Sequence, residues 1–289
     1  MERRVKKQMT VYKKYGETFK KLRKQRGFKL NQFGHLGISS AALCKFERGN
    51  SMLKFDSLIL ALSELSVTLS EYEKCLNNYD LDEHEVLIQE MIIANITNNL
   101  SEISMEYEKA LNLKEKELAL AIKGLYSPLN SDEIEILADY FEKIDFWRHT
   151  DLYTLYLSLD WLELPQIPFI IEGFFLVNLE VLNSIEHRTR VAHIVCRAAM
   201  IFISKKHEEM AKHLLNYLST KNYKHSMFTR NLYKFVKGYW MSEFAENEEG
   251  VMLMRETFKY FDELSYPEMS EYYKRLYEKY SHKKLPEVN

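Results

Sequence analysis

The chain has 289 residues and carries 40 Lys and Arg against 42 Asp and Glu, a net charge of −2. Its longest apolar run, residues 167–182, is interrupted by Glu172 and Asn178, which excludes an ordinary membrane-spanning helix, and the charged first residues exclude a signal peptide. Three widely separated cysteines favour buried thiols in a reducing compartment over a disulfide framework. We therefore expect a cytoplasmic protein with no membrane partner.

Charge and apolar spacing divide the chain into two domains. Apolar residues recur at helical spacing from residue 12 to residue 280 and strand-type alternation is scarce, which predicts an all-α fold. Residues 1–79 hold 16 Lys and Arg against 7 Asp and Glu, whereas residues 80–289 hold 24 against 35. A basic domain followed by an acidic one indicates that only the first meets a polyanion. The alternative is a solvated basic helix with no partner.

The first 79 residues have the pattern of a helix-turn-helix DNA-binding domain. The first helix is apolar at positions such as Phe19 and basic on its other faces, where Arg23 lies. Gly34 stands where a close helix contact would favour a residue without a side chain. Ser39 is a natural N-cap and Gly49 a natural residue to end a helix. The periodicity predicts five short helices, near residues 12–26, 31–36, 40–48, 55–65 and 70–79.

The third of these helices is the expected DNA-reading helix. Small side chains at its start fit base edges, and a lysine one turn later reaches a base or a phosphate. Glu47 is expected to be a structural carboxylate, and Cys44 a half-buried, inert thiol, with oxidation sensing as its alternative. For each candidate contact the alternative is ordinary solvation, and for Arg48 also pairing with a neighbouring helix. The candidate DNA contacts are Ser39, Ser40, Ala41, Lys45, Arg48, Gln32, Lys29 and Lys54.

This domain resembles a known family. The ending Leu43-x-Lys45-Phe46-Glu47-Arg48-Gly49 resembles the xenobiotic-response-element type of helix-turn-helix. More closely, SSAALCKFERG followed by KFDSLILALSELSVTLSEYEK resembles the Rgg/GadR/MutR transcription regulators of Gram-positive bacteria. Three positions depart from that pattern: Cys44 replaces Ser, Gly34 replaces Ala, and Leu30 replaces a polar residue from which relatives often contact DNA.

From residue 80 onward the chain predicts a solenoid of tetratricopeptide-like helical hairpins. Helices over residues 81–99 and 101–125 form the expected first pair. Pair starts about 35 to 42 residues apart indicate stacked hairpins, which curve and leave a concave face. The later helices are expected to start near Asp132, Thr150, Ile167, Arg188, His207, Met227, Glu249 and Glu268.

The resemblance implies that this C-terminal domain dimerises the protein and receives a short hydrophobic signalling peptide. Phe146-Trp147 followed by LYTLYLSLDWL is similar to the family's aromatic-rich helix pair. From the residues themselves, a groove for such a peptide needs apolar walls and cations for a carboxylate. The alternative is that the cations are solvated or paired with Glu, and that the tyrosines are core. The candidate peptide-binding residues are Arg190, His193, Arg197, Arg230, Tyr233, Lys234, Lys237, Tyr153 and Tyr156.

No signature of an enzyme is present in the sequence. The segment from His207 to Ala211 lacks the second histidine of a zinc-protease motif, and there is no CxxC and no Gly-rich phosphate loop. We therefore predict no catalysis, no cofactor and no metal. A small helix-turn-helix domain contacts few base pairs, so we expect a homodimer. The tyrosine-rich stretch 266–280 either forms the two-fold contact or closes the last hairpin.

These observations predict a transcriptional regulator that binds double-stranded operator DNA and is controlled by a short hydrophobic peptide, as in quorum sensing. Two alternatives remain open from the sequence. One is a regulator with a small-molecule ligand or none, and the other is a helical-repeat scaffold that sequesters a protein partner without binding DNA.

Overall fold

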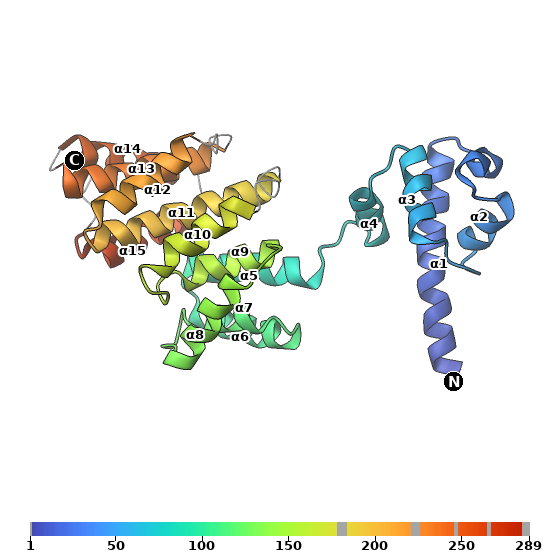
Figure 1. Cartoon of the computed structure of the whole chain (residues 1–289), viewed down its shortest axis with the longest axis horizontal. Helices are drawn as coiled ribbons and strands as arrows, with labels where there is room; N and C mark the ends of the chain where they lie inside the picture. The colour runs from blue at the N-terminus through green and yellow to red at the C-terminus, as the bar shows by residue number, and fades with distance from the viewer. Residues whose placement is uncertain (1, 178–183, 221–225, 246–247, 265–266, 285–289) are drawn as a thin grey trace. The chain divides into compact units, whose positions relative to one another are not determined.

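The computed structural model describes residues 2–177, 184–220, 226–245, 248–264 and 267–284, and within these ranges it is helical and contains no strand (Figure 1). The all-α prediction is therefore confirmed. The chain forms two compact units, residues 1–82 and residues 83–289. The division falls three residues after the boundary that the change of charge predicts. Among the described residues no helix combines the length and hydropathy needed to cross a membrane.

The N-terminal unit contains the five predicted helical elements. Four are α-helices, and the second is a 3-10 helix that ends at Gly37, whose φ of 75° is left-handed. At seven residues this element is longer than most 3-10 helices, which rarely exceed three or four residues. The elements are α1 (Glu2–Gln25), η1 (Leu30–Leu36), α2 (Ser40–Glu47), α3 (Phe55–Glu64) and α4 (Leu69–Leu76).

Helix α1 is the helix on which η1, α2 and α4 pack, while α3 packs on η1 and α4. Its Phe19 is fully buried and meets the rings of Phe33 and Phe46, with centroids 6.0 and 5.7 Å away. The buried Tyr72 of α4 donates a hydrogen bond of 2.7 Å to the carbonyl oxygen of Tyr15. The 3-10 helix, α2 and α4 are thus all fixed to one central helix.

The backbones of α1 and of the end of α2 approach closely at two glycines, Gly16 and Gly49. A Cβ on Gly16 would lie 1.8 Å from the carbonyl oxygen of Phe46, and one on Gly49 would lie 2.6 Å from Cα of Lys13. A Cβ on Gly34 would meet no atom within 4 Å. The prediction of a close contact at Gly34 was therefore wrong, because that residue faces open space.

Gly16→Ala is expected to lower the free energy of unfolding of the N-terminal unit by about 3 kcal/mol, because the added methyl group forces two backbones apart. Thermal unfolding of the full chain, followed by calorimetry, measures the effect. Gly34→Ala is the matched control, and its expected change is within about 0.5 kcal/mol. Equal stability of the two variants would contradict this account of the α1–α2 contact.

The C-terminal unit is a series of helices joined by short connections. The predicted helix 101–125 is two helices, because the chain turns at Lys114, whose φ is 65°, and Glu115. The elements are α5 (Glu83–Thr97), α6 (Leu100–Asn112), α7 (Lys116–Lys123), α8 (Ser131–Glu142), α9 (His149–Ser158), α10 (Gln166–Val177), α11 (Ile185–Ser204), α12 (Glu208–Thr220), α13 (Met227–Phe244), α14 (Glu248–Leu264) and α15 (Pro267–Ser281).

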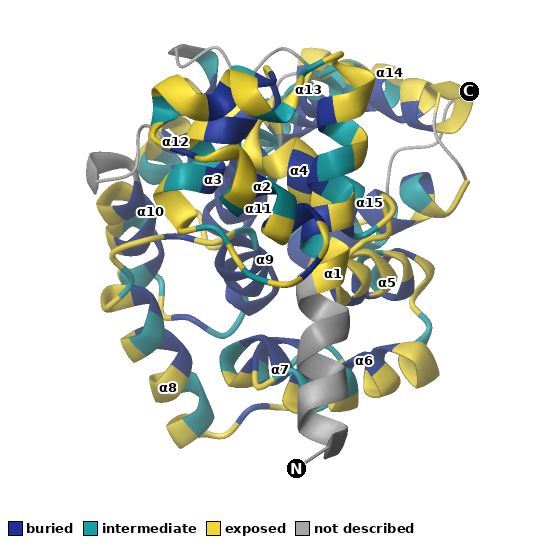
Figure 2. Ribbon diagram, turned by 90° about the vertical axis from the view of Figure 1, so that its right-hand side faces the viewer, coloured by how far each residue is buried: buried dark blue, intermediate teal, exposed yellow. Residues whose placement is uncertain are grey.

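Helical hairpins are the building blocks of this unit, as predicted. Helix α6 packs on α7, α11 on α12 and α13 on α14, while α7, α9, α11 and α13 each contact the next to form an inner layer. Helix α9 lies at the centre of the core, and its residues from Thr150 to Ser158 are all buried (Figure 2). The hairpins therefore stack around α9.

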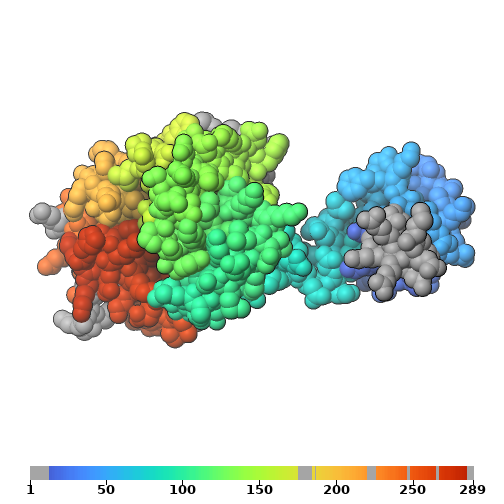
Figure 3. Space-filling model, turned by 90° about the horizontal axis from the view of Figure 1, so that it is seen from below, coloured from blue at the N-terminus to red at the C-terminus, as the bar shows by residue number. Residues whose placement is uncertain are grey.

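The last helix returns to the first helix of the unit. Helix α15 packs against α5, and the two surfaces lie side by side in Figure 3. Its tyrosines Tyr272, Tyr273, Tyr277 and Tyr280 are buried in the chain's own core. Of the two roles expected for this stretch, the structure shows that of closing the domain. Tyr266 lies outside the described residues.

Candidate functional site

The reading helix α2 is held at both ends as the sequence predicts. The Ser39 hydroxyl oxygen accepts a hydrogen bond of 3.1 Å from the backbone N–H of Ala42, and Gly49 donates to the Phe46 carbonyl oxygen at 2.8 Å. Leu43 and Phe46 are fully buried on its inner face. Capping at the start and glycine at the end limit α2 to about two turns.

All eight candidate DNA-contacting residues are exposed. Ser40, Ala41 and Lys45 lie on the outer part of α2, away from its buried face. The side-chain oxygen of Gln32 accepts a hydrogen bond of 2.6 Å from the backbone N–H of Lys29, so the NH₂ group of Gln32 is the part left for a ligand. Leu30 packs against the core of the unit. The other candidates are Ser39, Arg48, Lys29 and Lys54, and they are exposed to solvent as well.

A buried ion pair fixes α2 to α1. The guanidinium of Arg23 makes two hydrogen bonds to the carboxylate of Glu47, one of them 2.8 Å from Nη2 to Oε2, and both residues are less than 10% exposed. The hydrogen bond to Glu47 raises the pKa of Arg23 above its ordinary value. The prediction of a structural carboxylate at Glu47 is therefore confirmed. Cys44 is half-buried, as expected.

Two adjacent pockets in the C-terminal unit contain most of the predicted peptide-binding residues. The larger, about 360 Å³, lies between α13 and α14 and is lined in part by Met227, Arg230, Lys234 and Tyr260. The smaller, about 60 Å³, lies among α5, α9, α11 and α15. Its lining includes Tyr153, Tyr156, Arg190 and His193. Phe228 lines both pockets, so its side chain contacts the two of them.

Three predicted residues lie outside these pockets, and two of them, Tyr233 and Lys237, are on α13. Tyr233 is half-buried and packs against the main core, and Lys237 is exposed. Both are on α13 but are not among the residues that line either pocket. Helical spacing predicted that they lie on the same helix as Arg230 and Lys234. It did not predict which of these residues share a face of that helix.

Arg197 holds three elements together instead of facing a pocket. Its Nε donates to the Tyr280 hydroxyl at 3.1 Å, its Nη1 to the Tyr156 carbonyl oxygen at 2.9 Å and its Nη2 to Asp160 at 2.6 Å. Burial favours protonation of Asp160, but the charges of Arg197 and Lys279 outweigh it and hold the pKa of this carboxyl well below its ordinary value. The structure therefore corrects the prediction for Arg197: its guanidinium is fully engaged within the chain.

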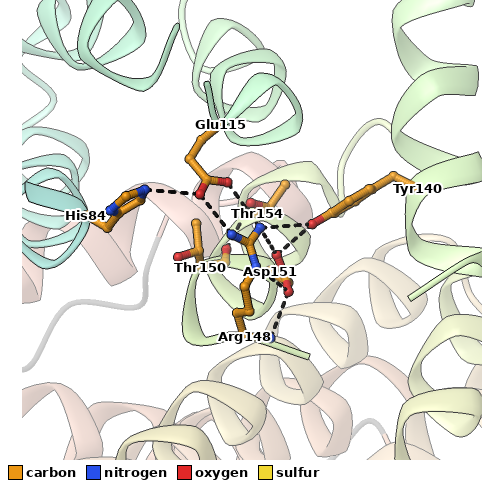
Figure 4. Close-up of polar contacts among 7 residues, drawn as sticks. All are labelled: His84, Glu115, Tyr140, Arg148, Thr150, Asp151 and Thr154. Atoms are coloured by element: carbon orange, nitrogen blue, oxygen red, sulfur yellow. Dashed lines mark hydrogen bonds and ion pairs between the residues drawn. The ribbon is translucent and has the colours of Figure 1, made fainter. Parts of the chain in front are cut away.

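A second polar cluster joins the starts of three helices and was not predicted from the sequence (Figure 4). Arg148, which caps α9, donates to Glu115 at 2.9 Å and to Asp151 at 2.7 Å. Tyr140 donates to Asp151 at 2.6 Å, and Nε2 of His84 lies 3.3 Å from Glu115. The backbone N–H of Arg148 donates to Asp151 at 2.7 Å, and an acidic residue three positions after the start of a helix is a local signal that could have revealed part of the cluster.

With both sites described, the comparisons decide the family. A family model described as "HTH-type transcriptional regulator Rgg, C-terminal domain" matches residues 97–275, more than half of the chain. The chain belongs to the Rgg family of transcriptional regulators. The resemblance to the Rgg/GadR/MutR regulators, which was stated from the sequence around α2, is thereby confirmed. The matched segment contains nearly all of the residues that line its two pockets.

Solved structures share the fold of this Rgg protein along almost its whole length. The Streptococcus dysgalactiae SHP pheromone receptor Rgg2 has a TM-score of 0.71 at 16% identity, covering 93% of this chain and 99% of that chain. A PrgX/cCF10 complex has a TM-score of 0.62 at 14% identity, with coverages of 95% and 94%. Bacillus thuringiensis PlcR in complex with the peptide PapR7 and DNA has a TM-score of 0.58 at 16% identity, with coverages of 91% and 99%.

Proposed function

We propose that this Rgg protein is a cytoplasmic homodimer that binds double-stranded operator DNA through residues 1–79 and is controlled by a short hydrophobic peptide bound in the two pockets that Phe228 lines. The observation that carries the proposal is the apolar cavity at Phe228, which has cations around it and lies in the same chain as an exposed, capped reading helix. PlcR, which has the same fold, was solved with a peptide and DNA.

The N-terminal unit has the properties of a DNA reader. Its reading helix is about 12 Å long, which fits across the major groove. Lysines and arginines outnumber acidic residues by 16 to 7 in residues 1–79, so phosphate contacts favour binding. A helix of this length reads few base pairs, and two copies on neighbouring half-sites therefore give the specificity that one copy lacks.

The C-terminal unit has the properties of a peptide receptor. A cavity of about 360 Å³ is within the range of ligand sites. Its rim includes large apolar side chains left in solvent, among them Met227, which is 80% exposed, and Leu264, which is 69% exposed. Apolar groups gathered at the mouth of a pocket favour an apolar partner over a highly charged one.

The double variant Ser40→Ala, Lys45→Ala is expected to lower operator affinity by about tenfold or more, because a base contact and a cation are both removed. A mobility-shift assay measures it, with a duplex selected by the wild-type protein from a random library. Lys74→Ala, an exposed lysine on α4, is the matched control. An unchanged affinity of the double variant would contradict the assignment of Ser40 and Lys45 as DNA contacts, and failure of the wild-type protein to select any duplex would favour the scaffold alternative. The same mobility-shift assay, repeated with added peptides, tests whether a bound peptide changes operator affinity.

A further inference from the structure

Two cations, Arg190 and Arg197, lie seven residues apart on α11, but only Arg197 has an anionic partner among the residues that the structure describes. Arg197 pairs with Asp160, as described above. Nε of Arg190 and Nε2 of His193 are buried and make no hydrogen bond to any residue that the structure describes. Both residues line the small pocket. Helix α11 therefore carries two unused polar atoms on residues that line the same small pocket.

The aromatic surroundings of Arg190 hold it in place without satisfying its donors. The centre of its guanidinium lies 4.5 Å from the centroid of the Tyr153 ring and 5.5 Å from that of Tyr156. A cation–π contact stabilises the charge of a guanidinium without supplying a hydrogen-bond acceptor to all of its N–H groups. The donors of Arg190 thus remain available to a planar acceptor.

A buried donor without an acceptor costs free energy, and more so when it is charged. Burial and the nearby charge of Arg190 lower the pKa of His193 to about 3, so this imidazole is neutral at pH 7 and keeps one N–H to donate. One fixed positive charge beside one neutral donor matches a single anion. The pocket of about 60 Å³ has room for a small group such as a carboxylate and excludes a large side chain.

We propose that the small pocket is a carboxylate subsite, in which a carboxylate of the bound peptide accepts hydrogen bonds from Arg190 and His193. The peptide's apolar side chains then extend past Phe228 into the larger pocket. This inference rests on the proposed peptide-receptor function. The carboxylate has two possible sources, the C-terminus of the peptide or the side chain of an Asp or Glu within it.

Three octapeptide libraries distinguish these sources when they are offered to the purified full chain. All three contain Gly, Ala, Val, Leu, Ile or Phe at each position. The first has a free C-terminal carboxylate, the second has a C-terminal amide, and the third has the amide and one Asp or Glu. Captured peptides are identified by mass spectrometry, and their dissociation constants are measured by fluorescence polarisation with an N-terminal label.

We expect the best free-acid peptides to bind about tenfold or more tightly than their amides, because only they supply a charged acceptor. Arg190→Gln is expected to remove this difference while apolar peptides keep weak binding. Arg190→Lys keeps the positive charge but not the planar guanidinium. This variant is expected to keep part of the difference in affinity between acids and amides. Arg188→Gln, on the same helix but outside both pockets, is the matched control and is expected to behave as wild type.

Each result supports or contradicts the subsite. If the tight binding lost in the amide library is recovered in the third library, the subsite binds the acidic side chain of the peptide. If only peptides of the first library bind tightly, the subsite binds the C-terminal carboxylate. Equal binding of acids and amides to the wild-type chain overturns the subsite and leaves the receptor function standing. An Arg190→Gln chain that still prefers acids also overturns it. Binding of no peptide from any library would contradict the receptor function itself.

Discussion

Glu47→Ala is expected to lower the free energy of unfolding of the N-terminal unit by about 3–5 kcal/mol, because Arg23 would stay buried without its carboxylate. Arg23 is 7% exposed and Glu47 is 5% exposed, so water does not replace the lost partner. The ion pair also sets the position of α2 on α1, and operator affinity is therefore expected to fall with stability. Calorimetry of the full chain and a mobility-shift assay measure the two effects.

The pair Lys13 and Glu17 on the same helix α1 gives a matched control. Their charged groups lie 3.5 Å apart, but their side chains are 63% and 52% exposed. Glu17→Ala is expected to cost less than about 1 kcal/mol. Replacing both buried partners, as in Arg23→Met with Glu47→Leu, is expected to restore most of the stability that Glu47→Ala loses. Equal losses of stability in Glu47→Ala and Glu17→Ala would show that burial does not determine the cost of breaking the Arg23–Glu47 pair.

Arg197→Met is expected to destabilise the C-terminal unit by about 3 kcal/mol, because one substitution removes three hydrogen bonds and the buried partner of Asp160. Thermal unfolding followed by circular dichroism measures the loss. Lys279 still contacts Asp160 at 2.7 Å, which limits the effect. Arg190→Gln, at the unpaired cation on the same helix, is the comparison, and its expected cost is much smaller. A reversed order of the two would contradict the assignment of Arg197 as structural.

Asp160 gives the same cluster a dependence on pH. Its pKa is held below the ordinary value in the folded chain, so its contribution to stability is present above pH of about 4 and is lost as the pH falls further. Asp160→Asn is expected to be less stable than wild type at pH 7, with a difference that shrinks in acid. A difference that grows as the pH falls would contradict the sign of this linkage.

The sequence predicted the reading helix well because its signals are local. Ser39, Gly49 and the buried pair Leu43 and Phe46 lie within eleven consecutive residues, and capping and helical spacing act over that distance. The exposure of Ser40 and Lys45 follows from the same spacing. The structural role of Glu47 was also predicted, although its partner Arg23 was counted with the exposed cations.

The sequence did not separate the roles of residues that depend on distant partners. Arg190 and Arg197 occupy one helix face, and what distinguishes them is Asp160 and Tyr280, which lie 37 and 83 positions from Arg197. Gly16 and Gly34 look alike in the sequence, but only packing of α1 on α2 makes Gly16 indispensable. The turn between α6 and α7 has neither glycine nor proline, since Lys114 itself adopts the positive φ.

The contact between α15 and α5 has a consequence for how the protein is made. Arg275 of α15 donates a hydrogen bond of 2.6 Å to the carbonyl oxygen of Ile96, near the end of α5. The C-terminal unit therefore completes this part of its core only after residues 267–281 have been synthesised, whereas the N-terminal unit precedes it on the ribosome. A chain that stops before Pro267 would thus contain the whole N-terminal unit but leave the α5 surface without α15.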